Sequence, residues 1–173
     1  MYALFNLDNI QIDYDRLLRM MDCEANRHAN IVLVGPPGVG KTTIAGRLAK
    51  DLNRTFIMAD ALVSVAVSGR VFKFSVPVDE PIKCPEIPLL HTHSSIIDGF
   101  VDVKSDFPTY YVAVYCSDDD VHRRRLIRRN ADFHITDKTA RHLEQIDQYS
   151  YLAMLETFDI EFLCSIDTTL TEV

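Results

Sequence analysis

A glycine-rich stretch, GPPGVGKT from Gly35 to Thr42, carries the clearest chemistry in the sequence. Glycines let a backbone curl so that successive N–H groups point at phosphate oxygens, and a helix that follows adds its positive end. In this G-x-x-x-x-G-K-T pattern, Lys41 would reach the β and γ phosphates of a nucleotide and the Thr42 hydroxyl would ligate Mg²⁺. The pattern predicts a nucleoside-triphosphate site formed by Gly35, Pro36, Pro37, Gly38, Val39, Gly40, Lys41, Thr42 and Thr43.

The segments on either side of this loop are the ones that such a site needs. The apolar run from Ile31 to Val34 precedes it and predicts a buried parallel strand. Residues 41–52 follow with apolar side chains four apart, which predicts a helix. Strand, loop and helix in this order resemble the Walker A loop of the P-loop NTPase superfamily, and the resemblance implies nucleoside-triphosphate binding.

That superfamily also uses an acidic residue at the end of a hydrophobic strand to hold Mg²⁺, and Asp98 in SSIIDGF is the candidate. The Gly-Pro-Pro-Gly spelling resembles ATPases of the AAA type. Those ATPases usually place a water-activating Glu after the Asp, where this sequence has Gly99. From the length of the sequence we also expect no helical lid domain of their kind. Motifs of GTPases and ABC-type ATPases are absent from the sequence.

The resemblance that remains is to small kinases of the adenylate, shikimate, gluconate and deoxynucleoside kinase group, over most of residues 29–166. It implies an ATP-dependent kinase with ATP and Mg²⁺ as cofactors. In members that phosphorylate an alcohol, a carboxylate just after the second strand receives or orients the acceptor hydroxyl, which points to Asp60 as a catalytic residue. An equal alternative is that Asp60 caps a helix or closes a turn.

A cluster of arginines runs from Arg123 to Arg129. In similar kinases, arginines at this place sit on a lid that closes over the transferring phosphate, so residues 118–141 are the expected lid and Arg124 and Arg128 the expected catalytic arginines. Helical spacing puts these two side chains on one face. The alternative is a solvated basic helix that pairs with its own acidic first turn.

The acceptor is the least legible part of the site. Nucleoside-monophosphate kinases usually continue Asp-Gly-Phe with Pro-Arg, whereas this chain continues with Val101-Asp102 and lacks that phosphate ligand. We expect a small-molecule acceptor that bears a hydroxyl or a phosphate, a nucleoside or nucleotide above all. The Pro-rich residues 61–90 are the expected acceptor-side insertion, and ATP versus GTP stays open.

Further runs complete the expected fold. Apolar segments at 55–58, 95–100, 110–115 and 158–166 predict four more strands, and helices are expected in 10–28, after Ser117, and from Thr136 to Glu156. Strands that alternate with helices imply one α/β domain over residues 1–173, a three-layer sandwich with a mainly parallel five-stranded sheet. The arginine-rich helix would form its lid.

Composition limits the classes of function. No run approaches the ~18 apolar residues of a membrane helix, and the N-terminus has no secretory pattern, so we expect a cytoplasmic protein with reduced cysteines. The net charge of −7 has the wrong sign for a general nucleic-acid surface. A kinase of a hydroxyl on DNA or RNA is therefore less favoured. An ATPase or switch protein acting on a partner is the other alternative, and oligomeric state is open.

Overall fold

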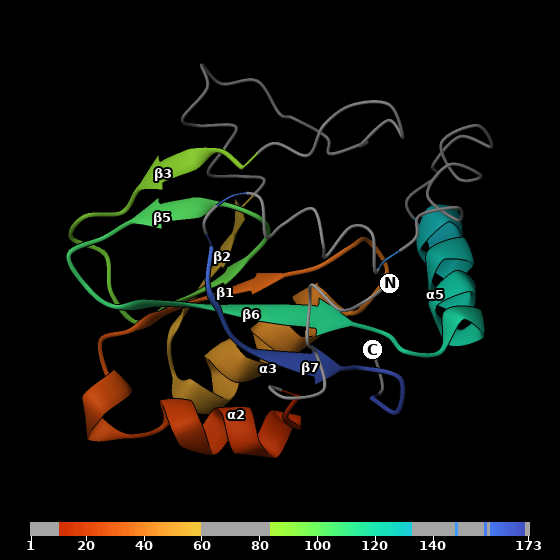
Figure 1. Cartoon of the computed structure of the whole chain (residues 1–173), viewed down its shortest axis with the longest axis horizontal. Coiled ribbons are helices and arrows are strands. Elements are labelled where there is room, and N and C mark those ends of the chain that lie inside the picture. Colours follow the sequence, from red (N-terminus) through yellow and green to blue (C-terminus); the bar gives the residue numbers. More distant parts are fainter. Residues whose placement is uncertain (1–10, 60–83, 133–147, 149–157, 159, 172–173) are drawn as a thin grey trace.

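The structure, a computed structural model, describes residues 11–59, 84–132, 148, 158 and 160–171 (Figure 1). Five parallel strands form the main sheet in the order β2-β4-β1-β6-β7. This confirms the predicted α/β class and parallel five-stranded sheet. The strands are β1 (Asn30–Val34), β2 (Thr55–Met58), β4 (Ser95–Asp98), β6 (Thr109–Tyr115) and β7 (Phe162–Asp167).

Burial follows the position of each strand in the sheet. Every residue of β1 and β4 is buried, because both strands have neighbours on each side and packing on both faces. The edge strand β2 leaves Phe56 and Met58 exposed. The last strand begins at Phe162 rather than at Phe158, so the prediction for this strand started four residues too early.

One face of the sheet is covered by the helices α2 (Tyr14–Met21) and α3 (Lys41–Leu52) (Figure 1). Their apolar stripes meet Ile31, Leu33 and other sheet residues in one buried core. The carboxylate of Asp13 caps α2 by accepting from Arg16 N at 2.7 Å. The chain then turns through the short helix η1 (Glu24–Asn26) into β1.

In the described part of the chain, the opposite face is covered by a small second sheet rather than by a helix. It pairs β3 (Glu86–Pro88) with β5 (Asp102–Lys104) in parallel. Ile87 and Val103 from these strands pack on Val32, Val34 and other residues of the main sheet. Residues 61–90, predicted as an acceptor-side insertion, contain β3, which tolerates Pro88 at its end because it belongs to a two-stranded sheet. Residues 60–83 lie outside the described part.

The arginine-rich segment forms α5 (Asp119–Asp132), beyond the carboxyl ends of the strands (Figure 1). Its cap is Asp118, one residue beyond Ser117, after which the helix was predicted. The Asp118 carboxylate accepts from the backbone N–H groups of Asp120 and Val121, and its carbonyl accepts the first helical bond from His122. The helix predicted over residues 136–156 lies outside the described residues apart from Gln148. None of the described helices is long and apolar enough to span a membrane.

Candidate nucleotide site

The phosphate loop, residues 35–42, leaves the carboxyl end of β1 and enters α3, as the sequence predicted. Gly38 and Gly40 have positive φ angles of 77° and 95°, which side chains other than glycine rarely adopt. Gly40 is also the cap of α3, and its carbonyl accepts from Ile44 N at 3.0 Å. The loop therefore sits at a helix N-terminus, where the partial positive charge of the helix attracts anions.

Thr42 and Asp98 meet at the mouth of this loop. Because β4 pairs with β1 in the register that sets Asp98 opposite Leu33, the Asp98 carboxylate lies at the same sheet edge as the loop. The Thr42 hydroxyl donates to Asp98 Oδ2 at 2.5 Å. The structure thus brings together the two residues predicted to hold Mg²⁺, although they are 56 positions apart in the sequence.

The chemistry of this pair fits Mg²⁺. A hydroxyl and a carboxylate are hard oxygen ligands, and Mg²⁺ in nucleotide sites takes one or two such protein ligands beside phosphate oxygens and water. Asp98 is only 9% exposed, so its charge is weakly screened. Bound Mg²⁺ would neutralise negative charge on the phosphates. In the described residues, no three His, Cys, Asp or Glu side chains are grouped as a metal site.

Lys41 and the other loop residues hold different positions. Lys41 Nζ donates to the carbonyl of Pro36 at 3.0 Å, across the loop that it would help to close on a phosphate. Pro36 and Pro37 carry no N–H, so they shape the loop without donating to phosphate. Val39 is fully buried and anchors the loop in the core, while Thr43 is exposed on the first turn of α3. Gly35 is buried at the start of the loop.

The face of α5 that carries His122 and Leu126 packs against the phosphate loop. We call this the inner face of α5, and the side of the loop that it contacts the back of the loop. His122 Nε2 lies 2.8 Å from the carbonyl oxygen of Pro37, and the Leu126 side chain packs beside Gly38. His122 is 4% exposed, and its burial lowers the pKa of the imidazole. Nearby Lys41 and Arg125 also lower this pKa, while the Pro37 hydrogen bond and Asp119 act against the shift. The sequence analysis assigned His122 no role.

Arg125 does not lie in the position expected of an arginine on a lid. Its guanidinium donates to the Thr168 hydroxyl at 2.8 Å, to the Thr168 carbonyl at 2.7 Å and to the Thr171 carbonyl at 2.9 Å. It therefore ties α5 to the chain that follows β7. Thr168 is fully buried and its hydroxyl donates to the carbonyl of Val39 at 2.5 Å. No motif marks Thr168, which reaches the loop across 129 positions.

The outer face of α5 carries the two arginines that were predicted to be catalytic. Arg124 and Arg128 are both exposed, as is Arg123. The helix predicted here is confirmed, whereas the lid function of these side chains stays a prediction. Asp60, the predicted acceptor base, lies just outside the described residues, one position after buried Ala59.

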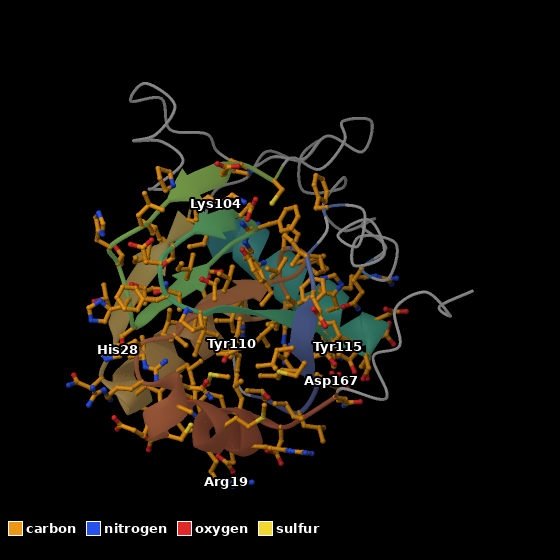
Figure 2. The ribbon with its side chains drawn as sticks, turned by 60° about the vertical axis from the view of Figure 1, so that its left-hand side comes forward. Arg19, His28, Lys104, Tyr110, Tyr115 and Asp167 are labelled. Atoms are coloured by element: carbon orange, nitrogen blue, oxygen red, sulfur yellow. The ribbon has the colours of Figure 1, made fainter. Side chains whose placement is uncertain are left out.

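The ends of β6 and β7 lie on the side of the phosphate loop away from β4. Tyr115 and Asp167 are register partners at this edge and lie side by side (Figure 2). Burial alone would raise the pKa of Asp167, but hydrogen bonds from Ser117 and Thr169 outweigh it and lower that pKa. Gln148 pairs its amide with the backbone N–H and carbonyl of Cys116. These bonds hold the segments around α5 in a fixed position.

The histidines of His91-Thr92-His93 lie at the other end of the sheet, before the start of β4. His91 Nδ1 is 3.3 Å from Asp106 Oδ2, and the His93 ring contacts His28 and Phe107. His28 marks this end in Figure 2, far from Tyr115 and Asp167. These histidines therefore lie in a loop at the end of the sheet opposite the phosphate loop.

Parts of the chain are similar to known kinases. The chain is 33% identical over 82 residues to the ATP-dependent kinase YFH7 of Vanderwaltozyma polyspora, which covers 46% of this chain and 23% of the relative. It is 49% identical over 45 residues to the shikimate kinase of Corynebacterium efficiens, which covers 24% of this chain and 27% of the relative. These alignments span less than a third of the curated relatives. A shikimate kinase structure from Acinetobacter baumannii in complex with shikimate aligns over 87% of both chains, at 17% identity and a TM-score of 0.48.

A match to a family model covers more of the chain. Residues 31–147, which include the phosphate loop, Asp98 and all of α5, match the model described as an AAA domain. The resemblance to the small P-loop kinases is supported by the kinase relatives. Because the model match extends over more than half of the sequence, the chain belongs to the AAA domain family.

Proposed function

We propose that this protein is an ATP-dependent kinase that transfers the γ-phosphoryl group of Mg-ATP to a small-molecule acceptor. The observation that carries the proposal is the hydrogen bond of 2.5 Å between Thr42 and Asp98 at the mouth of the phosphate loop. This pair is the oxygen ligand set that a Mg-nucleotide site needs. The kinases among the relatives support the same reaction class.

The residues of the site have separate roles in this proposal. Lys41 neutralises charge on the β and γ phosphates, and Thr42 and Asp98 hold Mg²⁺. Asp60 takes the proton of the acceptor hydroxyl. The oxygen of the acceptor then bonds to the γ phosphorus while the bond from that phosphorus to ADP breaks. Arg124 and Arg128, which are exposed on α5, stabilise the charge of the transferring group.

The acceptor in this proposal is a nucleoside or a nucleotide. The assignment comes from the resemblance to nucleoside and nucleotide kinases. Two of the relatives are named shikimate kinases, so a small hydroxy acid is the acceptor to compare with nucleosides and nucleotides.

The test is release of ADP from Mg-ATP with and without nucleosides, nucleoside monophosphates, sugars, shikimate and hydroxyl-ended oligonucleotides. The Lys41→Ala variant serves as the blank, because it removes the phosphate-neutralising amine. We expect release that rises with one acceptor class, together with a phosphorylated product, and at least a thousandfold less in the blank. Full transfer by a folded Lys41→Ala protein would refute the proposal.

A second candidate is an ATPase or switch protein, which the AAA domain match favours. Its usual water-activating carboxylate would stand at Gly99. There the φ of 137° and a built Cβ 2.5 Å from Ala59 Cβ leave no room for a glutamate. Because this geometry excludes a glutamate at residue 99, the ATPase function is less favoured than the kinase function. ADP release that is indifferent to every acceptor, and binding of a partner that depends on the nucleotide, would reverse the order.

A further inference from the structure

Two carbonyl groups of the phosphate loop are held from behind by side chains that no loop motif contains. His122 bonds to the carbonyl of Pro37 at 2.8 Å, and the Thr168 hydroxyl donates to the carbonyl of Val39 at 2.5 Å. The first comes from α5 and the second from the chain after β7. Both side chains are buried, at 4% and 0% exposure, so water does not compete for these bonds.

The direction of each hydrogen bond can be assigned. A carbonyl oxygen only accepts, so His122 carries its proton on Nε2. The Thr168 hydroxyl has one proton, and Val39 O at 2.5 Å is a closer acceptor than Tyr115 O at 3.2 Å. Arg125 donates to the same hydroxyl at 2.8 Å and thereby occupies it as an acceptor. The Thr168 hydroxyl therefore donates its proton to the carbonyl of Val39 in the loop.

A bond to a carbonyl also fixes the next N–H group. The peptide unit is planar and trans, so its N–H points opposite to its carbonyl, and the described chain contains no cis peptide bond. The carbonyl of Pro37 shares its plane with the N–H of Gly38, and the carbonyl of Val39 shares its plane with the N–H of Gly40. Holding these carbonyls from behind turns both N–H groups to the other side of the loop.

The two residues whose N–H groups are oriented in this way are the most flexible in the loop. Gly38 and Gly40 have no Cβ and rotate more easily than any other residue. A loop that had to order these peptide planes on binding would lose affinity through lost conformational freedom. External hydrogen bonds remove that cost before the nucleotide arrives.

We propose that His122 and Thr168 are positioning residues that orient the N–H groups of Gly38 and Gly40 toward the bound phosphates. Arg125 supports this role because its hydrogen bonds hold Thr168 in place. The inference rests on the nucleotide-binding part of the proposed function and is independent of the acceptor. Binding measurements therefore test it separately from phosphoryl transfer.

The first experiment measures binding of Mg-ATP and of inorganic tripolyphosphate by titration calorimetry. Thr168→Val keeps the shape of the side chain and removes the donor, and we expect both ligands to bind about tenfold more weakly. Thr168→Ser keeps the donor and should restore affinity to within about twofold. Thr109→Val is the matched control, since Thr109 lies at the start of β6, at the other end of the sheet, and its hydroxyl donates to the carbonyl of Phe107 at 3.5 Å.

The second experiment observes the peptide planes directly. The chain has six glycines, so labelling with ¹⁵N-glycine gives six backbone amide signals. We expect Thr168→Val to shift the Gly40 signal most and His122→Phe to shift the Gly38 signal most. His122→Gln, which places a donor near Nε2, should return Gly38 toward its original position. Gly46 in α3 is the internal reference, because no atom lies within 4 Å of its built Cβ.

The outcomes separate the two proposals. Unchanged binding and unchanged loop signals in folded Thr168→Val would overturn the positioning role, as would an equal loss in Thr109→Val. If Thr168→Val fails to fold, the pair His122→Phe and His122→Gln decides by the same criteria. Wild-type protein that binds Mg-ATP but phosphorylates no acceptor would refute the kinase and leave the positioning role intact. Wild-type protein that binds neither ligand would overturn both.

Discussion

The front and the back of the phosphate loop are built from different kinds of residue. On the front, Lys41 and Thr42 belong to the loop motif itself, and the Thr42 hydroxyl bonds to Asp98 from the neighbouring strand. On the back, His122, Leu126 and Thr168 come from elements 80 to 130 positions away and make contact through carbonyls and apolar atoms. The front supplies charge and metal ligands, whereas the back supplies shape.

This difference predicts how substitutions should behave. Front residues act on the bound nucleotide, so their loss should lower the rate of transfer while the fold remains. Back residues are buried or hydrogen-bonded parts of the structure, so their loss should lower stability and affinity together. The following variants test that division, beginning with the largest expected effect.

Asp98→Asn should lower the rate of phosphoryl transfer about 10²–10³-fold with little change in melting temperature. The amide oxygen of Asn still accepts from the Thr42 hydroxyl, but the charge that would hold Mg²⁺ is gone. The measurement is the transfer rate against Mg²⁺ concentration. Asp102→Asn is the control, because Asp102 pairs with Lys104 at 3.0 Å in the second sheet. Wild-type rates for Asp98→Asn at every Mg²⁺ concentration would contradict the assignment.

Gly38→Ala should destabilise the protein by about 3 kcal/mol in urea denaturation. Its φ of 77° is unfavourable for alanine, and its Cβ would lie 2.7 Å from Leu126 Cδ2. The cost arises at the back of the loop, so it should appear without nucleotide.

Two controls isolate the contact behind this effect. Gly46→Ala, in a helix with open space around its Cβ, should be neutral or stabilising by up to about 1 kcal/mol. In a Leu126→Ala background, Gly38→Ala should cost less than in the wild type, because the clash is relieved. Equal costs in both backgrounds would show that the backbone angle alone is responsible.

Arg125→Gln should lower the free energy of unfolding by about 2 kcal/mol, and Arg124→Gln should change it by less than about 0.5 kcal/mol. Arg125 gives three hydrogen bonds to Thr168 and Thr171, whereas Arg124 is exposed. Arg124→Gln should instead slow transfer if the lid prediction holds. Equal stability losses would contradict the distinction between the two faces of α5.

The front of the site could be predicted from the sequence because its information is local. The spacing of Gly35, Gly40 and Lys41 and the apolar run before them specify a loop between a strand and a helix. The predicted bounds of β2 and α3 agree with the structure residue for residue. Asp98 could be found because an acidic residue ends a hydrophobic run, and parallel pairing places that end beside the loop.

The back of the site has no such local signal. His122 stands within a run of basic residues, and nothing in that run shows which side of the helix faces inward until α5 is packed. The run from Arg123 to Arg129 groups Arg125 with the other arginines, but its hydrogen bonds go to a segment more than forty positions later. Strand β3 escaped prediction because it is three residues long and its neighbouring prolines obscure any periodicity.

The smallest predicted effect is a pH dependence of stability that comes from His122. Its pKa is lowered by burial in the folded state, so below about pH 6.5 the unfolded chain binds a proton that the native protein does not. Stability is therefore unaffected by this group above that pH. It falls as the pH decreases toward the native pKa, with a slope of at most about 1.4 kcal/mol per pH unit.

Urea denaturation between pH 5 and pH 8 measures this slope, and His122→Phe should reduce it. His91→Gln is the matched control, since the His91 side chain is 92% exposed and lies at the other end of the sheet. The charged groups that act on His122 are Asp119, which favours protonation, and Arg125 and Lys41, which oppose it. Bound nucleotide would add negative charge beside Lys41 and should weaken the slope, because phosphate favours the protonated imidazole. An unchanged slope in His122→Phe would show that the back of the loop contributes shape alone and no proton linkage.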